Sequence, residues 1–339
     1  MKQDFPARRA APLLLLGGLL VLAFFGSFLL GRYPIPLSQA VRILLSRVFP
    51  LEQTWTPEME TAVLNIRLPR ICMAVLVGAG LSGAGAAYQG VFRNPMAAPD
   101  LLGASGGAAL GAALAIVGEQ PARVILLCAF LCSLLAVGAA LFTAQRAPGR
   151  KVINLIFAGI MVSSLCTAGT SFLKLVADPS DQLPAITYWL MGSLAGVKRS
   201  ELFFAAAATL AGLLPLFLLR WRINLLTLGD DEARALGIDP NRLRMAVIFC
   251  ATLVTAAGVS VAGVIGWVGL IVPHFCRRLV GGDFRRLLPA SLLGGGVFLL
   301  LTDTLARNLA AVEVPLGILT ALIGAPFFLF LICRKERGL

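Results

Sequence analysis

Seven cysteines and one histidine are the side chains that could ligate a transition metal or supply a nucleophile and its base. They are Cys72, Cys128, Cys132, Cys166, Cys250, Cys276, Cys333 and His274. No two cysteines form a C-x-x-C pair, and all fall in or at the edge of apolar runs, where cysteine behaves as a small core residue. His274 has no acidic neighbour, so neither a zinc-hydrolase site nor a Ser/His/Asp arrangement can be assembled. We therefore predict no catalytic residue and no metal site.

The acidic residues lie in loops or near the ends of apolar runs, as Asp178, Asp181, Asp303 and Glu313 do. Carriers driven by protons or sodium usually keep ionisable groups near the bilayer midplane, because a titrating group must change occupancy there. This pattern argues against an ion-coupled secondary transporter, which stays as the alternative. A third possibility, an intramembrane enzyme, would need a nucleophile and a base.

No G-x-x-x-x-G-K-[ST] phosphate loop occurs, and the glycine-rich segment 103–107 lacks the lysine that would reach phosphates. We expect this chain to bind no cofactor and a separate ATPase to bind ATP and magnesium.

Gly103, Gly107 and Gly111 recur at a spacing of four, which places them on one helix face. Close helix packing is the favoured interpretation of this pattern.

The loop at about 221–243 is the longest charged segment and contains LGDDEARALG at 228–237. Its acids precede its arginine, which suits a short helix with carboxylates at its positive end and Gly237 as a stop. The segment is either a solvated connector or a docking surface for a cytoplasmic partner.

With 58% hydrophobic and 14% charged residues over 339 positions, the sequence indicates a polytopic membrane protein in which residues 1–339 form a single transmembrane domain. Apolar runs of roughly 20 residues predict helices and not strands, and we count about ten. The predicted spans are 12–32, 70–92, 99–118, 122–143, 152–175, 201–220, 244–265, 267–280, 287–305 and 315–333. The eighth is too short for a full crossing, so a short or broken helix is expected there.

The net charge of +12 is carried largely by alternating loops around 146–151, 220–244 and 277–286 and by both chain ends. By the positive-inside rule, these loops and both termini are predicted to be cytoplasmic, and nucleic acid is not an expected partner.

The sequence suggests a weak inverted internal repeat. The mutual spacings of Gly80, Ser82, Gly85 and Pro95 are the same as those of Gly258, Ser260, Gly263 and Pro273.

From about Arg67 to Cys333 the chain resembles the permease subunits of ABC importers for iron-siderophores, haem and cobalamin, the FecCD type. The matching blocks are RLPR at 67–70, Gln89 with RNPMAAPDLLGASGGA at 93–108, YWLMGSL at 188–194, LGDDEARALG at 228–237, GWVGLIVPH at 266–274 and PLGILTALIGAPFF at 315–328. Met96, Trp267 and Ala311 depart from the usual leucine, phenylalanine and proline, and the last could alter an outer turn.

The resemblance implies a type II importer fold: a homodimer of ten-helix subunits in the cytoplasmic membrane, with two cytoplasmic ATP-binding subunits and a periplasmic or lipid-anchored binding protein. It also implies that the 228–237 segment couples the permease to the ATPase. The expected coupling residues are Leu228, Gly229, Asp231, Glu232, Ala233, Arg234, Leu236 and Gly237.

On the outer side, the resemblance implies that Arg67, Arg70 and Arg307 meet acidic residues of the binding protein. Interfacial anchoring is the alternative role for exposed arginines. The inner gate is expected at Asn94, Pro95, Val152, Ile153 and Asn154, with ordinary core packing as the alternative. The chelate itself is not decided by the spans, because the binding protein would carry most of the selectivity.

Overall fold

The computed structural model describes residues 6–31, 33–149, 151–310 and 312–333. These residues form helices and no strand, which confirms the predicted all-α fold. The helices are α1 (Pro6–Leu29), α2 (Leu37–Leu45), α3 (Pro57–Thr61), the π-helical η1 (Ala62–Arg67), α4 (Leu68–Phe92), α5 (Ala104–Val117), α6 (Ala122–Arg146), α7 (Lys151–Val176), α8 (Gln182–Met191), α9 (Arg199–Leu228), α10 (Asp230–Ala235), α11 (Pro240–Ala262), α12 (Val268–Val280), α13 (Phe284–Asn308) and α14 (Leu316–Cys333). Ala311 and the basic residues Lys2, Arg334, Lys335 and Arg337 lie outside the described residues.

Each predicted span coincides with one helix, namely α1, α4, α5, α6, α7, α9, α11, α12, α13 or α14. Among the described residues, 7 helices are long and apolar enough to cross a membrane alone, while α5 and α14 are shorter apolar helices. The doubtful eighth span is α12, a helix of 13 residues, as expected.

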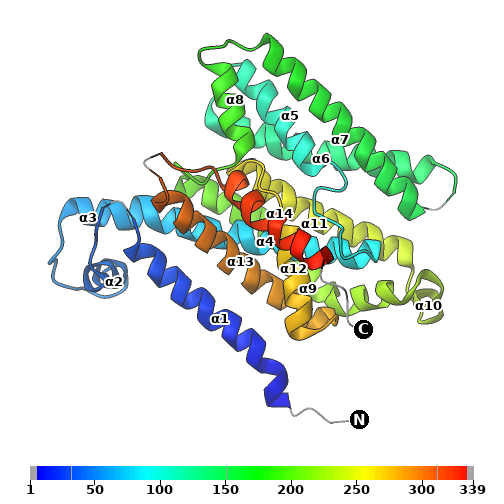
Figure 1. Cartoon of the computed structure of the whole chain (residues 1–339), viewed down its shortest axis with the longest axis horizontal. Coiled ribbons are helices and arrows are strands. Elements are labelled where there is room, and N and C mark those ends of the chain that lie inside the picture. Colours follow the sequence, from blue (N-terminus) through cyan, green and yellow to red (C-terminus); the bar gives the residue numbers. More distant parts are fainter. Residues whose placement is uncertain (1–5, 32, 150, 311, 334–339) are drawn as a thin grey trace.

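Helix α4 forms the centre of the molecule and packs against α9, α11, α12 and α13. In its most apolar stretch 78% of the residues are buried, whereas only 17% are buried in α1, which lies at the periphery. Helices α5, α6, α7 and α8 form a second layer stacked on α11 (Figure 1).

Glycines allow the central helices to touch backbone to backbone. A Cβ atom on Gly78 of α4 would lie 2.2 Å from the carbonyl oxygen of Gly295 in α13, and one on Gly85 would lie 1.8 Å from that of Gly269 in α12. Gly107 meets the carbonyl of Cys132 in α6 in the same way, at 2.5 Å. The predicted close packing is therefore confirmed for Gly107 and for Gly111, which meets the Cys128 carbonyl, both against α6 of the same chain, whereas Gly103 precedes α5 and lies against α7.

Helix α12 is short because an irregular segment separates it from α11. Gly263 ends α11 with a φ of 70°, and Trp267 precedes α12 with a φ of 71°. Gln89 of α4 holds α12 in place, since its amide nitrogen donates to the Leu270 carbonyl at 3.2 Å and its oxygen accepts from Arg277 at 3.1 Å.

The residues matched by the proposed internal repeat do not all lie in the same kind of local structure. Pro95 lies in the loop after α4, whereas Pro273 lies inside α12. The repeat therefore stays a prediction from sequence.

The cysteines are only partly core residues. All seven are free thiols, and Cys166, Cys250 and Cys276 are buried. Cys333 at the end of α14 is exposed, so the expectation of a core position is wrong there.

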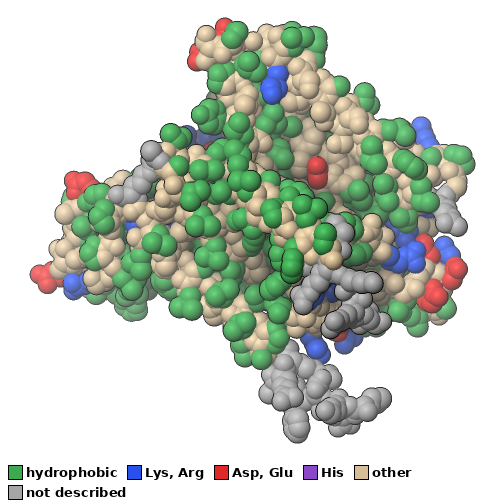
Figure 2. Space-filling view, viewed as in Figure 1, with side chains coloured by type: hydrophobic (Ala, Val, Ile, Leu, Met, Phe, Trp, Pro, Cys, Tyr) green, Lys and Arg blue, Asp and Glu red, His purple; other side chains and the backbone are tan. Residues whose placement is uncertain are grey.

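The molecule has two ends along its long axis (Figure 1). We call the end with α2, α3, the start of α4 and the end of α13 the α3 end, and the opposite end, with α10, the α10 end. The first residue of α1 and the last of α14 lie toward the α10 end. Hydrophobic side chains cover much of the visible face between the ends, and charged side chains gather around α10 (Figure 2).

Candidate functional site

Helix α10 is a single short helix set between two glycines at the α10 end. Its first turn holds Asp230, Asp231 and Glu232, next to the free backbone N–H groups that favour negative charge. Gly229 precedes it with a φ of 150° and Gly237 follows with a φ of 77°, values that non-glycine residues rarely adopt. The predicted short helix with carboxylates at its start is therefore confirmed.

Six of the eight expected coupling residues are exposed at this end. They are Leu228, Asp231, Glu232, Arg234, Leu236 and Gly237. Gly229 is buried, and Ala233 is 0% exposed. Ala233 faces the interior of its own chain, so it is not available to a docked partner and its expected place on the docking surface is corrected.

Asp230 links α10 to the rest of the molecule, and sequence reasoning did not select it. Its Oδ1 accepts from Nη2 of Arg244 in α11 at 2.8 Å and lies 3.7 Å from Nη2 of Arg93. Arg93 caps the end of α4 in the left-handed conformation, with a φ of 50°. One carboxylate thereby connects α10 to the end of α4 and to the start of α11.

The expected gate residues lie in two places, each held by its own loop. Asn94 and Pro95 are exposed in the loop after α4, where the Asn94 side chain accepts from the Met96 N–H at 2.8 Å. At the start of α7, Asn154 donates to the carbonyls of Ala147 and Pro148 at 3.0 and 2.9 Å.

Two gate positions at the start of α7 differ in environment. Val152 packs partly against the core, whereas Ile153 is 44% exposed. Ile153 is thus the apolar side chain free to meet another chain, and the gate role of all five residues stays a prediction.

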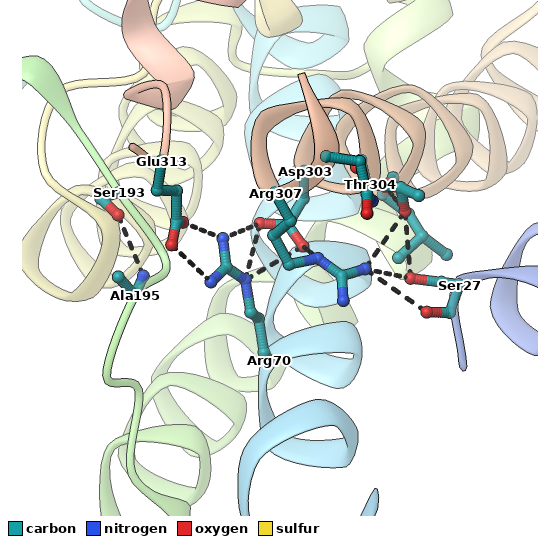
Figure 3. Close-up of polar contacts among 10 residues, drawn as sticks. Ser27, Arg70, Ser193, Ala195, Asp303, Thr304, Arg307 and Glu313 are labelled. Atoms are coloured by element: carbon teal, nitrogen blue, oxygen red, sulfur yellow. Dashed lines mark hydrogen bonds and ion pairs between the residues drawn. The ribbon is translucent and has the colours of Figure 1, made fainter. Parts of the chain in front are cut away.

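At the α3 end, Arg70 joins two carboxylates from distant segments (Figure 3). Its Nε and Nη2 donate to Oδ1 of Asp303 near the end of α13, at 2.9 and 2.8 Å. Its Nη1 donates to Oε2 of Glu313, between α13 and α14, at 3.1 Å, and Nη2 also pairs with Oε1. One guanidinium therefore ties α4 to α13 and to the segment that leads into α14.

Arg307 shares the same aspartate. Its Nε lies 3.2 Å from Oδ2 of Asp303, and its Nη2 donates to the Ser27 hydroxyl of α1 at 2.6 Å (Figure 3). The Asp303 side chain is 0% exposed, and its single negative charge forms ion pairs with two arginines. Arg67, at the end of η1, donates to the backbone carbonyls of Phe28 and Tyr33.

The three arginines expected to dock a binding protein are therefore engaged within their own chain. Arg67 and Arg70 are only 6% and 8% exposed, so the premise that they are exposed is wrong. Side chains of Arg67, Arg70, Arg307 and Glu313 do line a cavity of about 240 Å³ at this end. Docking of a binding protein on these arginines stays a prediction, and this cavity is the place where it could reach them.

Asp303 lies near the end of a span, as expected for the acidic residues. It lies in α13 and not in a loop, and it is fully buried. Its position five residues before the end of α13 agrees with an acid near a span end, and its two arginine partners make it part of a fixed ion-pair network.

The sequence profile of the FecCD transport family matches residues 19–334. The chain belongs to the FecCD transport family. It is 43% identical to a probable iron chelatin transport system permease of Helicobacter pylori, over 81% of this chain and 83% of that protein. It is also 39% identical to the hemin transport permease HmuU of Yersinia pestis, over 97% and 98%.

Another relative handles a different cargo. The molybdate import permease MolB of Haemophilus influenzae is 38% identical over 94% of each chain. Among solved structures, a metal-chelate type ABC transporter in an inward-facing conformation superposes with a TM-score of 0.85 at 36% identity, covering 94% of this chain and 98% of that one.

Family and fold together establish the coarse role. This FecCD chain is a multi-pass membrane protein and a permease of the ABC importer type, with the type II fold expected from its sequence. Permease subunits of this family are not themselves enzymes.

Proposed function

We propose that this permease carries a metal chelate across the cytoplasmic membrane by alternating access, driven by a separate ATPase. The observation that carries the proposal is the fold match to a metal-chelate ABC transporter over 94% of this chain. Relatives named for iron chelatin and hemin favour the same class of cargo. The working unit is a homodimer with two ATP-binding subunits inside and one binding protein outside.

The orientation follows from charge. The short basic loops around 146–151 and 277–286 and the arginines of 220–244 would place the α10 end in the cytoplasm under the positive-inside rule. Both the start of α1 and the end of α14 lie toward that end, which fits cytoplasmic termini (Figure 1).

Helix α10 is the proposed contact with the ATPase. Its exposed face carries Asp231, Glu232 and Arg234 with the apolar Leu228 and Leu236 at its two ends. An exposed face of this mixed kind suits a partner groove that is apolar at its floor and charged at its rim. Closure of the ATPases would move α10 as a rigid body, and Asp230 would pass the displacement on to α4 and α11.

Uptake into proteoliposomes tests this function. Permease, ATPase and binding protein would be reconstituted together, and entry of a ferric siderophore, haem, cobalamin or molybdate would be measured with and without internal Mg-ATP. We expect entry of one metal chelate that requires ATP. Entry driven by a proton or sodium gradient without ATP would support the ion-coupled alternative and contradict the proposal.

An absorption spectrum of the purified, substrate-loaded complex identifies the chelate. A porphyrin or corrinoid band would indicate haem or cobalamin, whereas iron without such a band would indicate a ferric siderophore.

A further inference from the structure

The two carboxylates on Arg70 differ in how firmly they are held. The Asp303 side chain is 0% exposed and also serves Arg307, so removing it would leave two buried arginines without their shared counter-charge. The Glu313 side chain is 28% exposed, and Arg70 is its ion-pair partner among the described residues. Glu313 is therefore the ligand that can leave Arg70 at lower cost.

The surroundings of Glu313 favour another carboxylate in its place. Arg67, Arg70 and Arg307 line the same cavity as Glu313, and Asp303 pairs with two of them, so this end holds three positive charges and two negative ones. The cavity of about 240 Å³ beside Arg70 has room for a side-chain carboxylate. The guanidinium group of an arginine binds a carboxylate by donating two parallel N–H···O hydrogen bonds. One carboxylate can therefore replace another on Arg70 with the same hydrogen bonds.

The segment that carries Glu313 is hydrogen-bonded to α13 and to the loop after α8. The Val314 N–H donates to the Ala306 carbonyl at 3.2 Å, and the Leu316 N–H, at the start of α14, donates to the Gly192 carbonyl after α8 at 2.8 Å. Glu313 also lines a second cavity, of about 600 Å³, between α8, the end of α11 and the segment before α14. Release of Glu313 would thus reach the first turn of α14 and one wall of this cavity.

We propose that Glu313 is an internal stand-in ligand on Arg70, which an acidic side chain of the extracytoplasmic binding protein replaces when it docks. While no binding protein is bound, the ion pair between Glu313 and Arg70 keeps the segment from 312 to 315 against α4. Replacement frees that segment while Asp303 keeps Arg70 in place. The partner in this inference rests on the proposed importer function.

Chemical rescue tests the exchange on the permease alone. Glu313→Ala removes one of the two carboxylates that pair with Arg70. We expect the thermal unfolding temperature of this variant in detergent to fall by several degrees. Potassium acetate, titrated against potassium chloride at constant ionic strength, should restore most of that loss. Asp303→Ala is the matched control, because its vacated position is closed to solvent and acetate should not restore it. Acetate that stabilises Glu313→Ala no more than the wild type would overturn the proposal.

Binding-protein association tests the replacement. Glu313→Gln keeps the size of the side chain and removes its charge, so the purified, substrate-loaded binding protein should associate with the reconstituted transporter faster by about tenfold. Glu58→Gln is the control, since Glu58 is an exposed acid of α3 at the same end without an ion pair among the described residues. It should leave the rate almost unchanged.

The outcomes separate the two claims. A wild-type transporter that does not bind a binding protein contradicts the proposed function, whatever acetate does. Wild-type binding with equal rates for both glutamine variants leaves the importer function intact and overturns the stand-in role of Glu313.

Discussion

The α3 end and the α10 end both carry clusters of charge, but the carboxylate at the centre of the α3 cluster is buried, whereas acidic side chains of α10 are exposed. Arg70 and Asp303 have side chains that are 10% and 0% exposed, whereas Asp231 on α10 is 93% exposed. A buried ion pair is costly to break, because the remaining charge loses its counter-ion in a medium of low dielectric constant. When an exposed ion pair is broken, water solvates the remaining charge. The α3 end is thus built to hold three segments together, and the α10 end to present charge to a partner.

The largest effect should come from Asp303→Ala. It leaves Arg70 and Arg307 without their shared carboxylate, and we expect a loss of about 3–5 kcal/mol in the free energy of unfolding. Thermal unfolding in detergent measures it. The matched exposed variant, Asp231→Ala, should change stability by less than about 0.5 kcal/mol. Equal losses for the two variants would remove the contrast between the ends.

A second comparison separates the two faces of α10. Leu236→Glu alters an exposed side chain that is 59% accessible, so it should leave folding intact and reduce transport per ATP hydrolysed by about tenfold or more. Ala233→Glu places a charge in a fully buried position and should instead destabilise the subunit. Uptake, ATPase rate and yield of folded dimer would be measured together. Normal coupling in Leu236→Glu would contradict a docking role for this face.

Asp230→Asn should have an intermediate effect. It weakens the link from α10 to Arg244, whose side chain is only 6% exposed, and the cost should be about 1–3 kcal/mol in stability. We expect transport per ATP to fall several-fold while basal ATP hydrolysis is retained. Asp231→Asn, one residue away and exposed, serves as the control. The link through Asp230 would be refuted if both variants couple normally.

The smallest effect concerns a helix cap at the α10 end. Asp283 caps α13 by accepting from the Arg285 N–H at 3.0 Å, and Asn224 of α9 donates to it at 2.7 Å. Partial burial raises the pKa of Asp283, but these hydrogen bonds and the nearby Arg285 and Arg286 outweigh it, so the pKa lies below its ordinary value of 3.8.

Because that pKa is lowered by folding, the stability that Asp283 contributes is present above pH 3.8 and is lost as the pH falls through the lowered value. Asp283→Ala should therefore cost about 1 kcal/mol near neutral pH and less in acid. Unfolding measured across that pH range checks it, and a difference from wild type that grows in acid would contradict it.

The sequence predicted those features that depend on local pattern. Hydropathy located ten of the helices, and the acidic start of the 228–237 segment predicted α10. The short helices α2, α3 and α8 were not predicted, because 9, 5 and 10 residues are too few to give a hydropathy signal.

The pairing of Arg70 with Asp303 could not be read from the sequence, since 233 positions separate them. The burial of Ala233 was not predicted, although one signal was present. Gly229 and Ala233 are small and four residues apart, the spacing that places two residues on one side of a helix. That spacing marks the buried side of α10 and leaves Asp231 on the other side.

Cryo-electron microscopy of the transporter in nanodiscs, free and with the substrate-loaded binding protein, would show directly which carboxylate lies on Arg70. We expect Glu313 on Arg70 in the free state and a carboxylate of the binding protein in its place in the complex, with Asp303 still paired. A complex in which Glu313 keeps its place on Arg70 would contradict this expectation.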